Sequence, residues 1–151
     1  MFLVRHGEYL PGTFGAGEPA LSTRGWEQAR AVGRFLARLG VHLERLVMSP
    51  YVRAQETAQA IVGELGEKPV MSIWQNLVPA GEPRAVMLAL ESLEGETSEV
   101  LVVGHMPLLG RVAHELCDAV SCGFALCTLM QFEYERGQWA FEGLWNCGEE
   151  M

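Results

Sequence analysis

Two arginines and two histidines occupy positions from which their side chains could act together on a phosphate. Arg5 and His6 close the first apolar run of the chain, and His105 directly follows a later one, Glu99 to Gly104. Arg53 lies about one helical turn beyond the end of another apolar run. A neutral imidazole is a nucleophile near neutral pH because its unperturbed pKa is about 6.5, and guanidinium groups pair with phosphate oxygens. The four residues therefore favour chemistry on a phosphoryl group.

Taken singly, each of these residues has an ordinary structural explanation. A histidine at the end of a strand is more often a satisfied core or loop residue than a catalyst, and an arginine in the first turn of a helix is usually solvated. His42 and His114 are assigned to that ordinary class. The other two histidines differ because the predicted fold brings them to the same place as the arginines.

Apolar periodicity predicts alternating strands and helices that would position these side chains. A helix is expected to begin at Ser22 or Thr23, and another at Ser49, which would cap it with Pro50 in its first position. The remaining expectations are strands at 2–5, 45–48, 70–74 and 99–104, helix ends at Gly40 and Gly66, helices at 83–93 and 107–116, a loop at 9–20, and a hairpin of 125–134 with 138–145.

Four strand-then-helix units predict a three-layer α/β/α fold with a mostly parallel central sheet and helices on both faces. The C-terminal antiparallel hairpin is expected at the sheet edge. Right-handed crossovers put the carboxyl ends of the parallel strands together, where such folds bind ligands. Both histidines and both arginines should converge there, beside a helix N-terminus suited to an anion.

Composition limits the classes of partner. The chain has 151 residues, which predicts a single domain spanning residues 1–151. Eleven basic and 19 acidic residues give a net charge of −8, which argues against binding to nucleic acid or to an anionic membrane. No apolar run approaches the roughly 20 residues of a membrane span, and no signal peptide is recognised, so a cytoplasmic location is expected.

The motifs, taken in order, resemble the histidine phosphatase superfamily, in its phosphoglycerate-mutase-like branch. They are Arg5-His6-Gly7, Leu21-Ser22 with Gly25 and Gln28-Ala29, Ser49-Pro50 with Arg53-Ala54 and Thr57-Ala58, and Gly104-His105. Within the superfamily, the short chain and the stretches 76–82 and 103–117 are most similar to the bacterial protein phosphohistidine phosphatases.

The resemblance implies that His6 is a nucleophile that passes through a phosphohistidine intermediate. Arg5, Arg53 and a protonated His105 would stabilise the charge on the phosphoryl oxygens. Gly7 would let the backbone approach the ligand, and the backbone N–H of Met106 would add a donor. No metal and no cofactor are implied.

The general acid departs from the pattern. Many phosphomonoesterases of the superfamily carry a glutamate shortly after the third strand, whereas this chain reads Gln75-Asn76-Leu77-Val78-Pro79. An alkoxide leaves poorly without a proton, while the P–N bond of phosphohistidine is labile. The departure favours phosphohistidine as substrate, with Glu8 and the more distant Glu82 as possible proton donors.

Short connections predict an uncovered crevice that could admit a phosphorylated side chain of another protein. From the resemblance, that protein would be a histidine phosphotransfer domain or a phosphohistidine carrier protein. Two alternatives stay open: a phosphatase for small phosphomonoesters, and a catalytically silent phosphate-binding protein.

Overall fold

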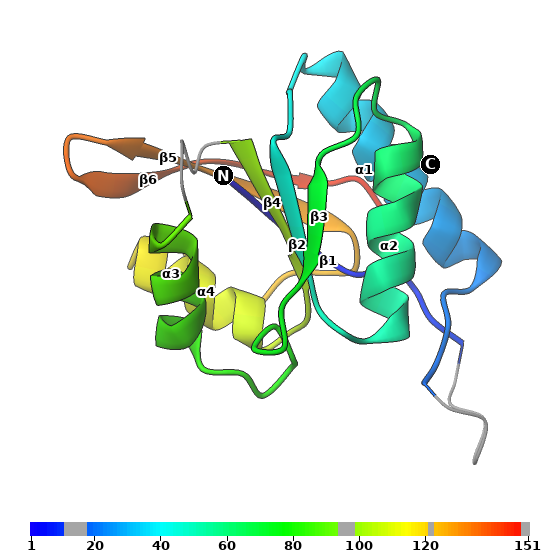
Figure 1. Ribbon diagram of the computed structural model, residues 1–151, viewed down its shortest axis with the longest axis horizontal. Helices are drawn as coiled ribbons and strands as arrows, with labels where there is room; N and C mark the ends of the chain where they lie inside the picture. Colours follow the sequence, from blue (N-terminus) through cyan, green and yellow to red (C-terminus); the bar gives the residue numbers. More distant parts are fainter. Residues whose placement is uncertain (11–17, 94–98, 121–122, 149–151) are drawn as a thin grey trace.

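The computed structural model describes residues 1–10, 18–93, 99–120 and 123–148, and it forms one six-stranded sheet between two pairs of helices (Figure 1). The expected loop at 9–20 includes residues 11–17, which lie outside the described residues. The strands are β1 (Phe2–Arg5), β2 (Arg45–Met48), β3 (Val70–Ile73), β4 (Val100–Gly104), β5 (Thr128–Glu135) and β6 (Gln138–Asn146).

The sheet has the strand order β3-β2-β4-β1-β5-β6. The first four strands in this order are parallel, and β5 and β6 add an antiparallel hairpin at the edge. The predicted fold class is therefore confirmed. Arg5 pairs with Gly104 across the neighbouring strands β1 and β4, so His6 and His105 leave the sheet side by side.

Two helices cover each face of the sheet (Figure 1). Helices α1 (Thr23–Arg38) and α2 (Val52–Gly63) pack together on one face. Helices α3 (Pro83–Glu91) and α4 (Leu108–Leu116) pack on the other. Because helices cover both faces of the sheet, the central strand β4 is buried along its whole length, and its sequence is apolar throughout.

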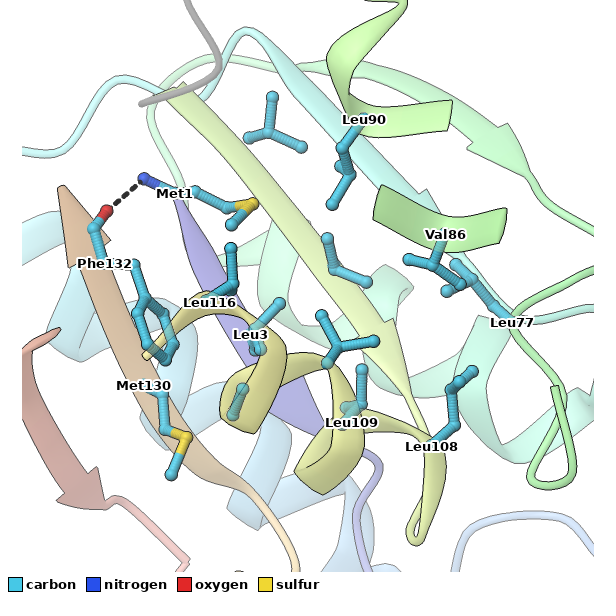
Figure 2. Close-up of a cluster of buried hydrophobic side chains, with 14 of the residues drawn as sticks. Met1, Leu3, Leu77, Val86, Leu90, Leu108, Leu109, Leu116, Met130 and Phe132 are labelled. Carbon is cyan, nitrogen blue, oxygen red and sulfur yellow. Dashed lines mark hydrogen bonds between the residues drawn. The ribbon is translucent and has the colours of Figure 1, made fainter. Parts of the chain in front are cut away.

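Each layer of helices buries its own hydrophobic cluster against the sheet. Figure 2 shows the cluster under α3 and α4, where Leu3 and Met130 from the sheet meet Leu90 and Leu109 from the helices. At the margin of this cluster the amino group of Met1 donates a hydrogen bond of 2.9 Å to the carbonyl of Phe132. The sheet is thus held between two packed layers, which keeps the ends of its strands in fixed positions.

The beginning of α2 differs from the sequence prediction. Ser49 was expected to cap this helix with Pro50 in its first position, but the helix begins at Val52 with Tyr51 as its N-cap residue. The Ser49 hydroxyl accepts a hydrogen bond from the Tyr51 amide at 3.1 Å and also contacts His105. Ser49 therefore contacts a residue of the site instead of capping α2.

None of the helices in the described ranges combines the length and the apolar character needed to cross a membrane.

Candidate active site

His6 is buried at the carboxyl end of β1, with 3% of its surface exposed. Its backbone N–H donates to the carbonyl of Gly104 at 3.0 Å, which continues the pairing of β1 with β4. Its Nδ1 lies 2.8 Å from the carbonyl of Gly7. Because a carbonyl only accepts hydrogen bonds, Nδ1 carries the proton, and the lone pair of the neutral ring is on Nε2.

His105 lies beside His6 at the end of β4, with the two ring centroids 5.0 Å apart. It is 1% exposed, and its Nε2 lies 2.7 Å from the hydroxyl oxygen of the fully buried Ser49. Its Nδ1 is also buried and has no hydrogen-bond partner in the described part of the chain. Since buried polar atoms are normally paired, this nitrogen suits a ligand.

Both predicted arginines, Arg5 and Arg53, lie beside the two histidines. Arg53, in the first turn of α2, directs its Nε–H at the Nε2 lone pair of His6, with 3.4 Å between the nitrogens. Arg5 donates to the carbonyl of Phe124 at 3.2 Å, while its Nε is buried without a partner among the described residues. Within those residues, neither guanidinium forms an ion pair with a carboxylate. Two unneutralised positive charges beside two imidazoles suit a doubly charged anion.

Burial and the nearby arginines keep both imidazoles neutral. Desolvation by burial, opposed by the hydrogen bond to Gly7 and reinforced by the charges of Arg53 and Arg5, lowers the pKa of His6 to about 4. Burial, His6 and the same two arginines lower the pKa of His105 to about 3. Without a bound anion, His105 is therefore neutral at neutral pH, and its protonation in the presence of a phosphoryl group stays a prediction. A bound anion would favour its protonated form.

Two tyrosines frame the site, and sequence reasoning missed both. The guanidinium carbon of Arg53 lies 4.8 Å from the ring centroid of Tyr9 and 4.9 Å from that of Tyr51. Tyr9 also meets His6 edge to face at 5.3 Å, and Tyr51 meets His105 in the same way at 4.9 Å. Each tyrosine thus contacts one histidine and the shared arginine. The only available signal was their closeness in sequence to His6 and Arg53.

Gly7 packs closely against the start of α1, and its expected role in letting the backbone approach a ligand stays a prediction. Its N–H donates to the Thr57 hydroxyl at 3.1 Å, and that hydroxyl in turn donates to the carbonyl of Arg53 at 2.7 Å. A Cβ on Gly7 would lie 2.7 Å from the carbonyl oxygen of Gly25. The glycine therefore allows close packing against the start of α1, and its amide is not free for a substrate.

A buried turn supports the same strand end from the side of β5. The N–H of Cys127 donates to the carbonyl of Arg5 at 3.0 Å and to that of His6 at 3.3 Å. Cys127 reaches this position with a φ of 53°, a conformation uncommon for a residue other than glycine. Residues of such strained conformation persist where the surrounding structure holds them, here directly behind the two site residues.

The two candidate proton donors lie in different surroundings. The Glu8 carboxylate accepts a hydrogen bond of 2.9 Å from Ser22, the N-cap residue of α1, and lies 3.9 Å from Arg24. These contacts engage Glu8 with the start of α1. Glu82 is an exposed residue at the N-cap position of α3.

The helix end beside the site is already engaged by a carboxylate. The first amide of α2, that of Val52, donates to Glu18 at 2.7 Å. This N–H was expected to be available to a bound anion, but the Glu18 carboxylate already accepts from it. Met106 follows His105 directly, and its side chain packs against the cluster under α3 and α4. The site's positive character therefore comes from Arg5 and Arg53 rather than from the start of α2.

Comparison with known proteins places this geometry in context. Residues 1–77 match the model of the histidine phosphatase superfamily, branch 1. The phosphohistidine phosphatase SixA of Escherichia coli is 30% identical over 118 residues, covering 78% of this chain and 73% of that protein. The SixA homologue of Haemophilus influenzae is 36% identical over 126 residues, covering 77% and 76% of the two chains.

A solved structure of the protein histidine phosphatase SixA complexed with tungstate superimposes with a TM-score of 0.86. It is 26% identical in sequence and covers 95% of this chain and 94% of its own. The likeness to the bacterial phosphohistidine phosphatases expected from the sequence is confirmed.

Proposed function

Because this chain belongs to the histidine phosphatase superfamily, we propose that it is a protein phosphohistidine phosphatase in which His6 is the nucleophile. The observation that carries the proposal is the fixed tautomer of His6. Its Nδ1–H is held by the Gly7 carbonyl, so the Nε2 lone pair lies beside the Arg53 guanidinium, where a phosphoryl group would bind.

The reaction proceeds in two displacements. The Nε2 lone pair of His6 forms a bond to phosphorus while the P–N bond of the substrate breaks. The electron pair of that bond returns to the substrate ring, whose other nitrogen carries a proton, so a neutral imidazole leaves. Water then attacks the phosphorus of phosphorylated His6. The bond to Nε2 breaks, inorganic phosphate leaves, and the neutral histidine is restored. No step passes through a metal or a cofactor.

Arg5 and Arg53 stabilise the charge on the phosphoryl oxygens in both displacements. In the unliganded site the Nε–H of Arg53 points at the lone pair of His6. A phosphoryl oxygen is a better acceptor for this charged donor, so substrate binding frees the lone pair for attack. The same arginine therefore shields the nucleophile before binding and positions the phosphate afterwards.

His105 contributes through its Nδ1, which has no hydrogen-bond partner within the described ranges. The Ser49 hydroxyl pairs with Nε2 and orients the ring. The dianionic phosphoryl group raises the pKa of His105 and favours its protonated form, in which the Nδ1–H donates a hydrogen bond to a phosphoryl oxygen. The imidazolium expected from the sequence thus forms with the substrate rather than before it.

The leaving group favours phosphohistidine over an alkyl phosphate. Imidazole is a weak base and departs with little help, while an alkoxide needs a proton donor. Glu8 is engaged by Ser22 and Arg24, and Glu82 is exposed at the start of α3. The substrate class that suits the site is therefore a cytoplasmic phosphoprotein, either a histidine phosphotransfer domain or a phosphocarrier protein.

The proposal is tested by comparing kcat/KM on a phosphorylated histidine phosphotransfer domain with kcat/KM on a panel of sugar phosphates. We expect the phosphoprotein to be preferred by at least about 100-fold, since the panel lacks a weakly basic leaving group. Preference for the panel would overturn the proposal in favour of a small-molecule phosphatase. Binding of phosphate without turnover of either substrate would indicate a silent phosphate-binding protein.

A further inference from the structure

We propose that Tyr9 and Tyr51 form a subsite for the flat ring of the leaving imidazole, so that the protein selects phosphorus bound to an aromatic nitrogen. The proposal rests on the proposed function and extends it from the phosphoryl group to the group that departs. It assigns a role to two side chains that none of the motifs includes.

Both tyrosine rings contact the guanidinium of Arg53. The ring centroids lie 4.8 Å (Tyr9) and 4.9 Å (Tyr51) from the guanidinium carbon, within the range of cation–π contacts. The N–H groups of a guanidinium lie in its plane, so they can bind a phosphoryl group while its face contacts an aromatic ring. A phosphoryl group bound to these N–H groups lies next to both aromatic side chains.

The direction of the reaction places the leaving ring against them. In-line displacement puts the leaving nitrogen on the side of phosphorus opposite the Nε2 of His6. His6 is 3% exposed, whereas Tyr9 is 40% exposed while still contacting that ring. The exposed part of the site is therefore lined by Tyr9, and a ring leaving outward passes it.

The backbone of Tyr9 is anchored rather than free to swing away. Tyr9 forms an antiparallel bridge with Leu21, next to the N-cap of α1, and the amide of Leu10 donates to the carbonyl of Ala20 at 2.9 Å. Tyr51 is held by its amide, which donates to Ser49. A ring pair fixed in this way can contact an imidazole without first being ordered, which reduces the entropic cost of binding.

The chemistry of the contact distinguishes leaving groups. An imidazole can stack on a tyrosine or meet it edge to face, and such contacts contribute beyond the buried area. Ammonia, the leaving group of phosphoramidate, has no ring, although it also leaves from a labile P–N bond. Two P–N substrates therefore share the phosphoryl chemistry and differ in the contact with the tyrosines.

The test compares free phosphohistidine with phosphoramidate in wild-type protein and in Tyr9→Leu, Tyr9→Phe, Tyr51→Leu and Tyr51→Phe. We expect each leucine variant to lose about 3- to 10-fold in kcat/KM for phosphohistidine and to change less than about twofold for phosphoramidate. The phenylalanine variants should retain the wild-type preference. Tyr134→Leu is the matched control, because Tyr134 is an exposed tyrosine on β5 whose ring meets Trp139 edge to face, away from both histidines.

Inhibition by tungstate serves as a second readout, because tungstate reports on the phosphoryl site alone. Equal losses on both substrates, together with weaker tungstate inhibition, would overturn the subsite and leave the tyrosines as supports for Arg53. Unchanged preference in the leucine variants would overturn it as well. If wild-type protein turns over phosphoramidate but neither free phosphohistidine nor the phosphorylated histidine phosphotransfer domain, the proposed function itself fails, which is a distinct result.

Discussion

The rings of His6 and His105 lie 5.0 Å apart at the ends of adjacent parallel strands, tilted by 58°. Each ring has one nitrogen engaged by the protein: Nδ1 of His6 by the Gly7 carbonyl, and Nε2 of His105 by the Ser49 hydroxyl. Of the opposite nitrogens, Nδ1 of His105 has no hydrogen-bond partner among the described residues, and Nε2 of His6 meets the Nε–H of Arg53 at 3.4 Å. In the proposed mechanism the pair offers a nucleophile and a hydrogen-bonding group to the same phosphate, and different neighbours set the two roles.

Replacing Arg53 should be far more harmful than replacing an arginine of α1. We expect Arg53→Ala to reduce kcat/KM by about 100- to 1000-fold, because it removes a charged donor beside the nucleophile. Arg24→Ala is the matched control, since Arg24 has a side chain that is 59% exposed and pairs only loosely with Glu8 at 3.9 Å. Steady-state kinetics measures both. Similar losses in the two variants would mean that Arg53 does not bind the phosphoryl group.

Ser49 should support activity through His105. Ser49→Ala leaves Nε2 of His105 and the amide of Tyr51 without their partner. We expect a loss of about 1 to 3 kcal/mol in the free energy of unfolding and a fall in kcat of about 10- to 100-fold. The control is Ser92→Ala, which removes an exposed hydroxyl at the end of α3. Wild-type kcat in the Ser49 variant would show that the ring of His105 is oriented by other contacts.

The two buried histidines should make stability depend on pH below neutrality. Their pKa values fall from 6.5 in the unfolded chain to about 4 for His6 and about 3 for His105 in the folded protein. Between these values the unfolded chain binds more protons, so this contribution to stability is complete above pH 6.5 and is lost as the pH falls. We expect each histidine to contribute a loss of about 1 to 2 kcal/mol between pH 6.5 and pH 5.

Urea denaturation at a series of pH values measures this effect. The comparison is with the double variant His6→Gln and His105→Gln, in which the carboxylates still titrate but the two imidazoles are gone. Its unfolding free energy should fall less steeply below pH 6.5. The same slope in both proteins would mean that the histidines keep ordinary pKa values in the folded state.

The loop after β1 lies so close to the start of α1 that a methyl group at Gly25 should not fit between them. A Cβ on Gly25 would lie 2.0 Å from the carbonyl oxygen of Glu8, so Gly25→Ala must displace the loop that carries His6. We expect a loss of about 3 kcal/mol or more in unfolding free energy, together with loss of activity. Gly63→Ala has open space around the new Cβ and should stabilise α2 by about 0.5 to 1 kcal/mol. Thermal and urea denaturation measure both unfolding free energies. Equal changes in the two variants would contradict the close packing at Gly25.

The arrangement of strands and the convergence of the site were readable from the sequence because both follow from local patterns. Buried parallel strands appear as continuous apolar runs, and the strands at 2–5 and 45–48 have the predicted limits. Once β1 and β4 are parallel and adjacent, His6 and His105 must emerge together. The positions of the nucleophile candidate and its neighbour thus depend on topology, which periodicity can predict.

What the sequence could not predict depends on contacts between distant segments. Ser49 before Pro50 has the local pattern of a helix cap, but its hydroxyl lies 2.7 Å from His105, which outweighs the local preference. Tyr9 and Tyr51 carry no motif, and only the fold shows that both contact Arg53. The depressed pKa of His105 likewise follows from burial and from neighbouring charges rather than from residue type.

The central claim is that His6 carries the phosphoryl group during turnover. Rapid-quench labelling tests it directly, with a histidine phosphotransfer domain that carries labelled phosphate as the substrate. The wild-type protein should form an acid-labile, alkali-stable phosphoenzyme within one turnover, and His6→Ala should form none. No labelled enzyme in wild type, or a label that persists in His6→Ala, would contradict the account.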